Sequence, residues 1–317
     1  MVSSVAMSAT DTHRTIDAVW RIESARLIAG LARIVRDVGL AEDLAQDALV
    51  AALERWPETG VPDNPGAWLM ATAKHRAIDV FRRAERLERK TAELGREIVE
   101  AEEPDWAAAL DEVVEDDVLR LVFIACHPVL SREARVALTL RLVGGLTTDE
   151  IARAFLVAEA TVAQRIVRAK RTLTAAKVPF EVPAGAEFTA RLSSVLEVIY
   201  LVFNEGYAAT SGEEWVRPAL CQEALRLGRI LAALTPGESE VLGLVALMEI
   251  QASRLRARVS ETGEPVLLPD QDRSRWDRVL IGRGLTALER AGQCGTSLGP
   301  YALQAAIAAC HARAHTA

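Results

Sequence analysis

The sequence has few of the features that mark membrane, secreted or disulfide-bonded proteins. Aromatic residues make up only 5% of its 317 residues, and its four cysteines form no CxxC pair. No stretch approaches the roughly 20 uninterrupted apolar residues that a membrane-spanning helix needs. The first ten residues also lack the basic start and apolar block of a signal peptide. We therefore expect a cytoplasmic protein with no membrane partner.

The cysteines allow two interpretations. Cys126-His127 and Cys310-His311 place metal-binding residue types side by side. Each pair lies in an apolar helical stretch, however, which favours buried, reduced thiols at these positions and at Cys221 and Cys294. We expect neither a metal nor a cofactor.

The charge is unevenly distributed along the chain. The formal net charge of −7 argues, taken alone, against a nucleic-acid-binding protein. Lys74–Lys90 nevertheless holds seven Lys/Arg against three acids, whereas Glu97–Asp117 holds ten acids and no base. A second basic segment contains Arg165, Arg168, Lys170 and Arg171. Two basic islands separated by an acidic stretch suggest two DNA-facing modules joined by a linker.

Helical periodicity dominates the chain, and no convincing alternating strand is present, so we expect an all-α fold. Proline and glycine clusters divide it into three blocks. In the first two blocks we expect a helix that ends near Gly39, a second over Ala41–Trp56, a third over Ala67–Lys90 and a fourth over Glu133–Val143, which ends at Gly144-Gly145. Pro57, Gly60, Pro62 and Pro65 should break the chain after the second. The last block, from about Glu187, has four or five helices with loops at Asn204–Glu214, Gly263–Gln271 and Gly292–Pro300.

Leu146–Leu173 has the pattern of a helix-turn-helix. Thr147 and Glu150 fit a capping box, and a turn at Leu156–Glu159 precedes the second helix. Val162, Ile166, Ala169 and Leu173 recur at helical spacing and should face the core. The opposite face carries Thr161, Gln164, Arg168 and Arg171, with Arg165 on the flank. Such a face is often only solvated, but after a capped helix and a tight turn it is typical of a DNA recognition helix.

The first block carries two further candidate surfaces. Asp43, Gln46 and Asp47 share one helix face, which is either a solvated acidic face or a docking surface for a basic helical partner. Downstream, Trp68 opens a helix with a basic run. Aromatic and basic groups together can bind a single nucleic-acid strand, although Trp68 alone would more simply be core.

These residues resemble extracytoplasmic-function sigma factors of the sigma-70 superfamily. Leu40–Leu49 looks like the family's polymerase-clamp-binding helix, Ala67–Arg83 like its −10 recognition and melting segment, and Phe155–Leu173 like its −35-reading helix. The three matches follow the family's order. The resemblance implies a sigma region 2 over residues 14–93, an acidic linker over 94–115, a sigma region 4 over 116–178 and a helical extension over 184–317.

The resemblance also implies partners and residue roles, within a protein that is not an enzyme. The partners are core RNA polymerase, through its β′ clamp and β flap, and promoter DNA. By this resemblance, Asp43, Gln46 and Asp47 would bind the polymerase. The −10 element would be bound by Trp68, Lys74, His75, Arg76, Arg82 and Arg83. The −35 element would be bound by Thr161, Gln164, Arg165, Arg168 and Arg171. His75, Ala158 and Ala163 depart from the family's usual Asn, Ser and Lys, which puts the promoter sequence in doubt.

The third block resembles an extension found in one sigma subgroup. Asn204–Gly212, Asp270–Arg278 and Gly299–His311 are similar to that tetratricopeptide-like extension, which implies regulation by the extension and, as its signal, a YCII-related protein or a small molecule. In the subgroup the extension continues further, so we expect a shortened form here. Two rivals remain: a one-component regulator with a ligand-sensing C-terminal domain, and an enzyme built from Glu205, Tyr207, Glu213, Asp270, Asp272 and His311.

Overall fold

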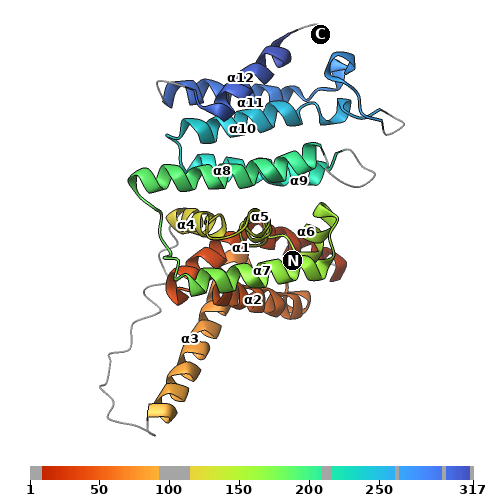
Figure 1. The fold of residues 1–317 in the computed structure, drawn as a ribbon. Coiled ribbons are helices and arrows are strands. Elements are labelled where there is room, and N and C mark those ends of the chain that lie inside the picture. The colour runs from red at the N-terminus through yellow and green to blue at the C-terminus, as the bar shows by residue number, and fades with distance from the viewer. Residues whose placement is uncertain (1–8, 93–114, 209–215, 261–263, 295–297, 315–317) are drawn as a thin grey trace. The chain divides into compact units, whose positions relative to one another are not determined.

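The computed structural model describes residues 9–92, 115–208, 216–260, 264–294 and 298–314 (Figure 1). Over these ranges the chain is helical, with a single isolated bridge between Val259 and Pro265, so the predicted all-α class is confirmed. None of the described helices combines the length and apolar character needed to cross a membrane. The chain divides into two compact units, residues 1–124 with 170–182 and residues 125–169 with 183–317, and each is described by itself.

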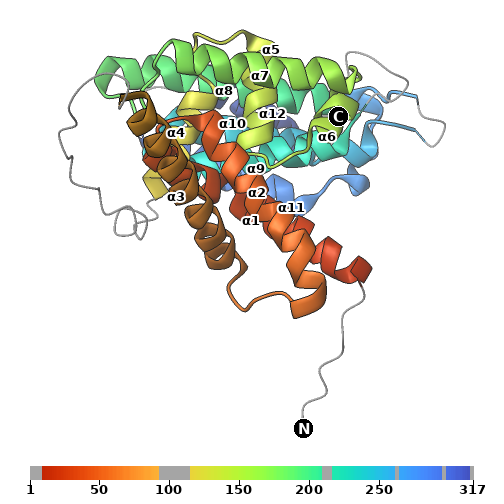
Figure 2. The same cartoon turned by 90° about the horizontal axis from the view of Figure 1, so that it is seen from below.

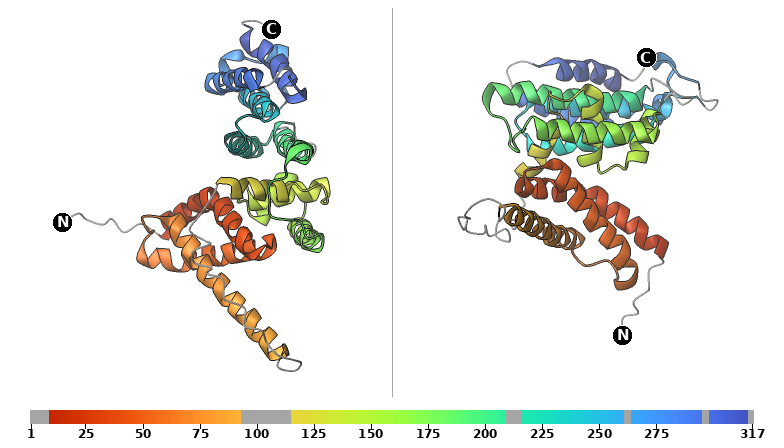
Figure 3. Two further views of the ribbon diagram at one scale, coloured as in Figure 1. Left: turned by 90° about the vertical axis from the view of Figure 1, so that its left-hand side faces the viewer. Right: turned by 60° about the horizontal axis from the view of Figure 1, so that its bottom comes forward.

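The first unit is built around three helices, α1 (Ala9–Val35), α2 (Val38–Thr59) and α3 (Pro65–Ala92), with α4 (Glu115–Ala125). Figure 2 shows α1, α2 and α3 side by side. The inner face of α2 is lined by small residues, Ala41, Ala45, Ala48 and Ala52, which are fully buried and allow its neighbours to approach closely. The second half of α3 projects away from the other two helices (Figure 3).

The ends of α1 and α2 differ from the expected ones. The helix expected to reach Gly39 ends at Val35, and α2 begins before Ala41 because the Asp37 carboxylate accepts a hydrogen bond from the Leu40 amide at 2.8 Å. The expected end at Trp56 was wrong, since α2 continues through Pro57 to Thr59 and ends at Gly60, another of the expected breakers. Pro57 lies in the last turn, where its missing N–H costs only one intrahelical bond.

The second unit starts with the helix-turn-helix. It contains α5 (Arg132–Leu142), α6 (Thr148–Phe155) and most of α7 (Glu159–Ala175). The predicted capping box is confirmed, because the Thr147 amide donates to Glu150 Oε2 at 2.8 Å and the Glu150 amide donates to Thr147 Oγ1 at 3.1 Å. The turn into α7 passes through Leu156 in the left-handed conformation, with φ of 50°.

The rest of this unit is a helical block. Its helices are α8 (Gly185–Tyr207), α9 (Pro218–Leu234), α10 (Ser239–Ala252), α11 (Arg278–Cys294) and α12 (Pro300–Arg313), with short 3-10 turns η2 (Leu255–Ala257), η3 (Leu268–Asp270) and η4 (Arg273–Arg275). Residues Val241–Ile250 of α10 are all buried, as expected for a helix surrounded by neighbours. The loop expected to begin at Asn204 begins later, because α8 runs to Tyr207.

Close packing against α10 depends on two features. A Cβ atom at Gly243 would lie 2.6 Å from the Ala302 amide nitrogen, so only glycine lets α12 come this near. The Glu240 carboxylate accepts hydrogen bonds from the Tyr301 and Ala302 amides at 3.0 and 3.2 Å. The Glu240 carboxylate of α10 thus acts as a cap for α12: it satisfies free amides in the first turn, and its negative charge interacts favourably with the dipole of α12.

Candidate nucleic-acid interface

Helix α7 has one buried and one exposed face. Val162, Ile166, Ala169 and Leu173 are at most 6% exposed, which confirms the inward stripe that their spacing predicts. The opposite side chains of Thr161, Gln164, Arg168 and Arg171 are exposed, and Arg165 is half-buried on the flank. The helix therefore presents amide, hydroxyl and guanidinium groups to solvent from a fixed backbone, as base and phosphate contacts require.

Helix α3 carries the second basic surface. Trp68, His75 and Arg82 are seven residues apart and lie on one side of the helix. His75, Arg82 and Arg83 are exposed, and Lys74 is half-buried. Arg76, also half-buried, lies 2.8 Å from the Asp47 carboxylate of α2. One cation of the proposed strand-binding set is thus already paired with an acid of the proposed polymerase-binding set.

Trp68 is half-buried, so it can be both a core residue and a stacking surface, the two interpretations that the sequence allows. Its ring makes an edge contact with Trp56, with ring centroids 5.3 Å apart and planes at 68°. Trp56 is only 1% exposed, so it fixes one side of Trp68 to the core. The rest of the Trp68 ring remains accessible for stacking.

The acidic surface of α2 includes a buried acid that the sequence analysis missed. Asp43 and Asp47 are exposed, with side chains 73% and 55% accessible, and the half-buried Gln46 donates to Glu42. Glu42 is 2% exposed and lies 2.5 Å from the Lys170 ammonium, which is also 3.3 Å from Asp43. Lys170 therefore belongs with these acids and not with the exposed arginines of α7.

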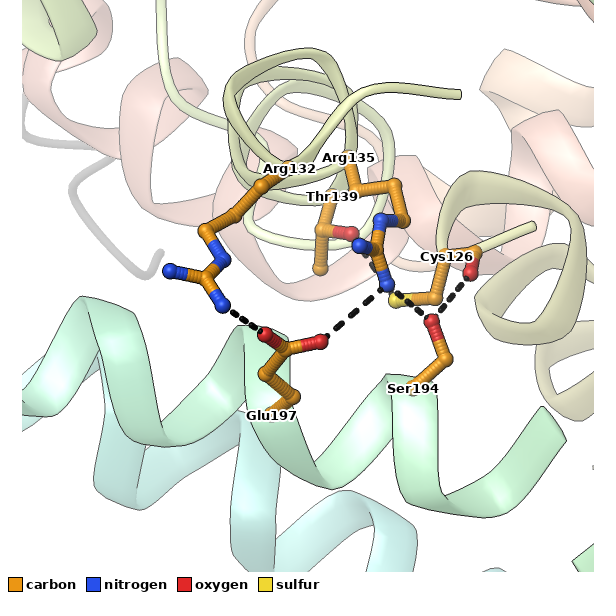
Figure 4. Close-up of polar contacts among 6 residues, drawn as sticks. All are labelled: Cys126, Arg132, Arg135, Thr139, Ser194 and Glu197. Carbon is orange, nitrogen blue, oxygen red and sulfur yellow. Dashed lines mark hydrogen bonds and ion pairs between the residues drawn. The ribbon is translucent and has the colours of Figure 1, made fainter. Parts of the chain in front are cut away.

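The side of the helix-turn-helix that faces α8 is closed by polar contacts (Figure 4). Glu197 of α8 bridges two arginines of α5, at 2.5 Å from Arg132 and 3.4 Å from Arg135. Ser194 accepts a hydrogen bond from Arg135 and donates to the Cys126 carbonyl at 2.8 Å. These contacts hold α8 against the start of α5.

Two arginines on or just before α9 extend this contact to the ends of other helices. Arg226 donates to the Val143 carbonyl at the end of α5, at 2.8 Å, and Arg217 donates to the Ala154 carbonyl in the last turn of α6. Arg217 also lies 2.7 Å from Glu205, with both side chains 11% exposed. Cations at helix C-termini satisfy free carbonyls and favour the dipole. In the sequence, the only signal for these two arginine contacts is the three-residue spacing of Glu223 and Arg226, which suits a helical ion pair.

A cavity of about 170 Å³ lies between the helix-turn-helix and α8. Its lining includes Val136, Phe155 and Leu201, which are apolar, and Arg132 and Arg165. The arginine that flanks the exposed face of α7 and the arginine held by Glu197 therefore border one space.

The thiols fall into two classes. Cys126 and Cys221 are buried, and burial raises the pKa of each to about 12. Cys294 and Cys310 are exposed, so the expectation that all four would be buried was wrong for these two, which lie on the outer sides of α11 and α12. Among the residues that the structure describes, no group of three potential metal ligands comes together.

Several residues of the enzyme alternative have structural contacts. Glu205 is paired with Arg217, and the Asp272 carboxylate caps η4, where its hydrogen bonds from Ser274 lower its pKa. His311 is exposed, and its carbonyl accepts a hydrogen bond from Arg273. Glu213, and all but the last residue of the acidic linker (94–115), lie outside the described residues.

Comparisons with known proteins match three parts of the chain. Residues 22–87 match sigma-70 region 2, residues 120–173 match sigma-70 region 4, and residues 191–292 match a family of unknown function, DUF6596. The one-component regulator does not explain the region 2 match. No solved structure matches the chain.

Two curated relatives align over large parts of the chain. An uncharacterized protein of Rhizobium meliloti (strain 1021) is 45% identical over 288 residues, covering 90% of this chain and 68% of that protein. A probable ECF RNA polymerase sigma factor, SigI of Mycobacterium tuberculosis, is 27% identical over 171 residues, covering 52% of this chain and 57% of that protein. The region 2 and region 4 matches, in this order on an all-α chain, make it a sigma factor of the sigma-70 family, a group of transcription factors whose partners are core RNA polymerase and promoter DNA.

Proposed function

We propose that this alternative sigma factor belongs to the extracytoplasmic-function group, docks on core RNA polymerase through α2, and contacts promoter DNA through α3 and α7. The observation that carries the proposal is the orientation of α7, whose apolar stripe is buried while Gln164 and Arg168 are exposed. The partial identity to SigI supports the assignment to the group.

The polymerase-binding role of α2 is supported by its exposed acids. Asp43 and Asp47 stand on an otherwise alanine-lined helix that is packed firmly on its inner side. A rigid helix with exposed carboxylates suits a basic helical partner such as the β′ clamp. The Asp47–Arg76 pair would then place the polymerase contact directly beside the basic row of α3.

Of the two proposed DNA contacts, α3 would bind single-stranded DNA and α7 would bind double-stranded DNA. The exposed His75, Arg82 and Arg83, with the accessible part of Trp68, suit an unpaired −10 strand, where rings stack on bases and cations pair with phosphates. The exposed face of α7 suits the −35 major groove. Each well-placed base contact there contributes about 1–3 kcal/mol of discrimination.

We further propose that the extension regulates region 4 through the contacts of Figure 4. Glu197 occupies Arg132 and Arg135 with a carboxylate, the same chemistry that a DNA phosphate would offer them. Arg217 and Arg226 add contacts to the ends of α6 and α5. The tetratricopeptide-like character of the extension and a YCII-related partner stay predictions.

In vitro transcription with core polymerase, on a promoter taken from the gene's own upstream region, tests the proposal. Asp47→Arg should abolish initiation because it reverses the charge of the docking face and repels Arg76. Glu58→Arg, the same charge change on an exposed position in the last turn of α2, should retain most activity. Wild-type protein that neither joins core polymerase nor supports initiation would refute the proposal.

A further inference from the structure

The three segments of the extension that the sequence analysis singled out meet around one group of arginines. Tyr207, from the first segment, lies under the Arg258 guanidinium, which is 3.8 Å from the ring centroid. Trp276, from the second, has Arg254 at 5.8 Å and Arg273 at 4.6 Å from its ring. Arg273 in turn donates to the His311 and Ala314 carbonyls at the end of α12.

This group, defined as Arg254, Arg258 and Arg273 with Tyr207 and Trp276, has an excess of positive charge. Arg254 is only 7% exposed, yet neither it nor Arg258 has a carboxylate within ion-pair distance among the described residues. The nearby Asp272 is used to cap η4. Burial, with Arg258 and Arg273 close by, lowers the pKa of Arg254, so the site disfavours its own charge when no anion is present.

Several polar atoms of the group and its surroundings also have no partner. Within the part of the chain that the structure describes, the Nε atoms of Arg254 and Arg258 and the indole Nε1 of Trp276 are buried donors without an acceptor. Buried charges are normally paired, and an unsatisfied buried donor often marks an ion that belongs there. Three such donors on neighbouring side chains, two of them cationic, favour an anion as their partner.

The aromatic rings hold the arginine side chains in place while their N–H groups remain available to an acceptor. Tyr207 stacks on Phe203, with planes 16° apart, and Trp276 is 3% exposed in the core of the extension. Cation–π contacts with these fixed rings orient the guanidinium groups without using their N–H groups. A pre-oriented guanidinium loses little conformational freedom when it binds an oxyanion with its forked donors.

We propose that Arg254 and Arg258 form a binding site for a phosphate group, either free or carried on a small organic molecule. Arginine pairs bind phosphate oxygens through several charge-assisted hydrogen bonds, and Arg258, which is partly exposed, gives the ligand an approach from solvent. The site lies in the extension and does not depend on the promoter-binding function proposed above.

Titration calorimetry and thermal unfolding of the full chain test the proposal, with inorganic phosphate, phenyl phosphate, acetate and chloride at matched ionic strength. Phosphate should raise the unfolding temperature by a few degrees above the chloride value, because a ligand that binds only the folded state stabilises it. Tighter binding of phenyl phosphate would indicate a phosphorylated organic ligand, and equal or weaker binding the free anion. An acetate effect as large as that of phosphate would overturn the phosphate assignment.

Arg258→Gln should weaken phosphate binding at least about tenfold, the effect of losing one charge-assisted hydrogen bond. Arg256→Gln is the matched control, because Arg256 is exposed and lies between the two site arginines in the chain. If Arg258→Gln loses helicity, Arg258→Lys keeps the charge without the forked donors and should weaken binding several-fold. Equal shifts with phosphate and chloride, or full phosphate binding by the folded Arg258 variants, would refute the site.

Discussion

The two sides of the region 4 helices use the same residue types in opposite ways. On the inner side, toward α8 and α9, Arg135 is held by Ser194 and Glu197, and the Val143 and Ala154 carbonyls are held by Arg226 and Arg217. On the outer side of α7, Gln164, Arg168 and Arg171 are exposed. Inner groups should therefore determine stability, whereas outer groups should determine recognition, and the Arg217 and Arg168 variants below test that division directly.

Thiol reactivity should show the largest difference between buried and exposed positions. Because burial raises its pKa to about 12, the Cys126 thiol should be almost entirely protonated at pH 8, and burial hinders the reagent further. We expect Cys294 and Cys310 to react on the order of a thousandfold faster than Cys126 and Cys221. A thiol-counting reagent should thus find two fast groups in folded protein and four after denaturation.

The pH dependence of the thiol reaction and one cysteine substitution check which thiols are buried and which are exposed. Because the thiolate reacts, Cys126 should react faster as the pH rises toward its pKa, which narrows the difference. Cys310→Ser should remove one fast group. Four fast groups in folded protein would contradict the burial of Cys126 and Cys221.

Arg217→Ala should cost about 3 kcal/mol of unfolding free energy, near a 150-fold change in the folding equilibrium, because it breaks a largely buried ion pair and a helix-end contact. Arg153→Ala is the control, since its pair with Asp149 is 70% and 57% exposed and should contribute less than about 0.5 kcal/mol. Urea unfolding measures both. Similar small losses for the two variants would show that α9 does not stabilise the helix-turn-helix.

Arg168→Ala should leave stability nearly unchanged but weaken promoter binding by the polymerase complex about tenfold. If Arg168 contacts a phosphate, the slope of log affinity against log salt should also fall by about one. Fluorescence anisotropy with a labelled −35 duplex measures both quantities. Lys177→Ala, an exposed position just after α7, should change neither. An unchanged affinity for Arg168→Ala would place the DNA contact elsewhere.

Glu197→Gln should have the smallest effect, a gain of about threefold in affinity for −35 DNA, because partly exposed ion pairs are weak. The gain would follow from freeing Arg132 and Arg135 for phosphate. Glu187→Gln, another acid of α8 that pairs with Arg191 instead, is the matched control. A loss of affinity in the Glu197 variant would mean that the extension supports region 4 rather than restraining it.

Local signals predicted the fold better than they predicted contacts between helices. The capping box at Thr147 and the apolar spacing from Val162 to Leu173 are complete within a few residues, so the structure confirms them. The start of α2 was missed because the Asp37 cap lies before Gly39, which reads as a helix breaker. The Glu197 contacts join residues 62 and 65 positions apart, a distance at which one sequence gives no signal.

The candidate surfaces were also predicted only where the signal is local in the sequence. Exposure of Asp43, Asp47 and Arg168 follows from helical spacing, which depends only on neighbours in the chain. Burial of Glu42 beside Lys170, and the exposure of Cys294 and Cys310, depend on which helices meet in space. Their assignment to polymerase and DNA stays a prediction.

The burial of α10 limits how the extension can be shortened in the laboratory. Val241 through Ile250 have neighbours on every side, and at Gly243 the backbone itself touches α12. Removing α12 would open this helix to water along one side, and we expect such a fragment to aggregate. Deletion variants should therefore end before α8 or keep the helices through Arg313 together.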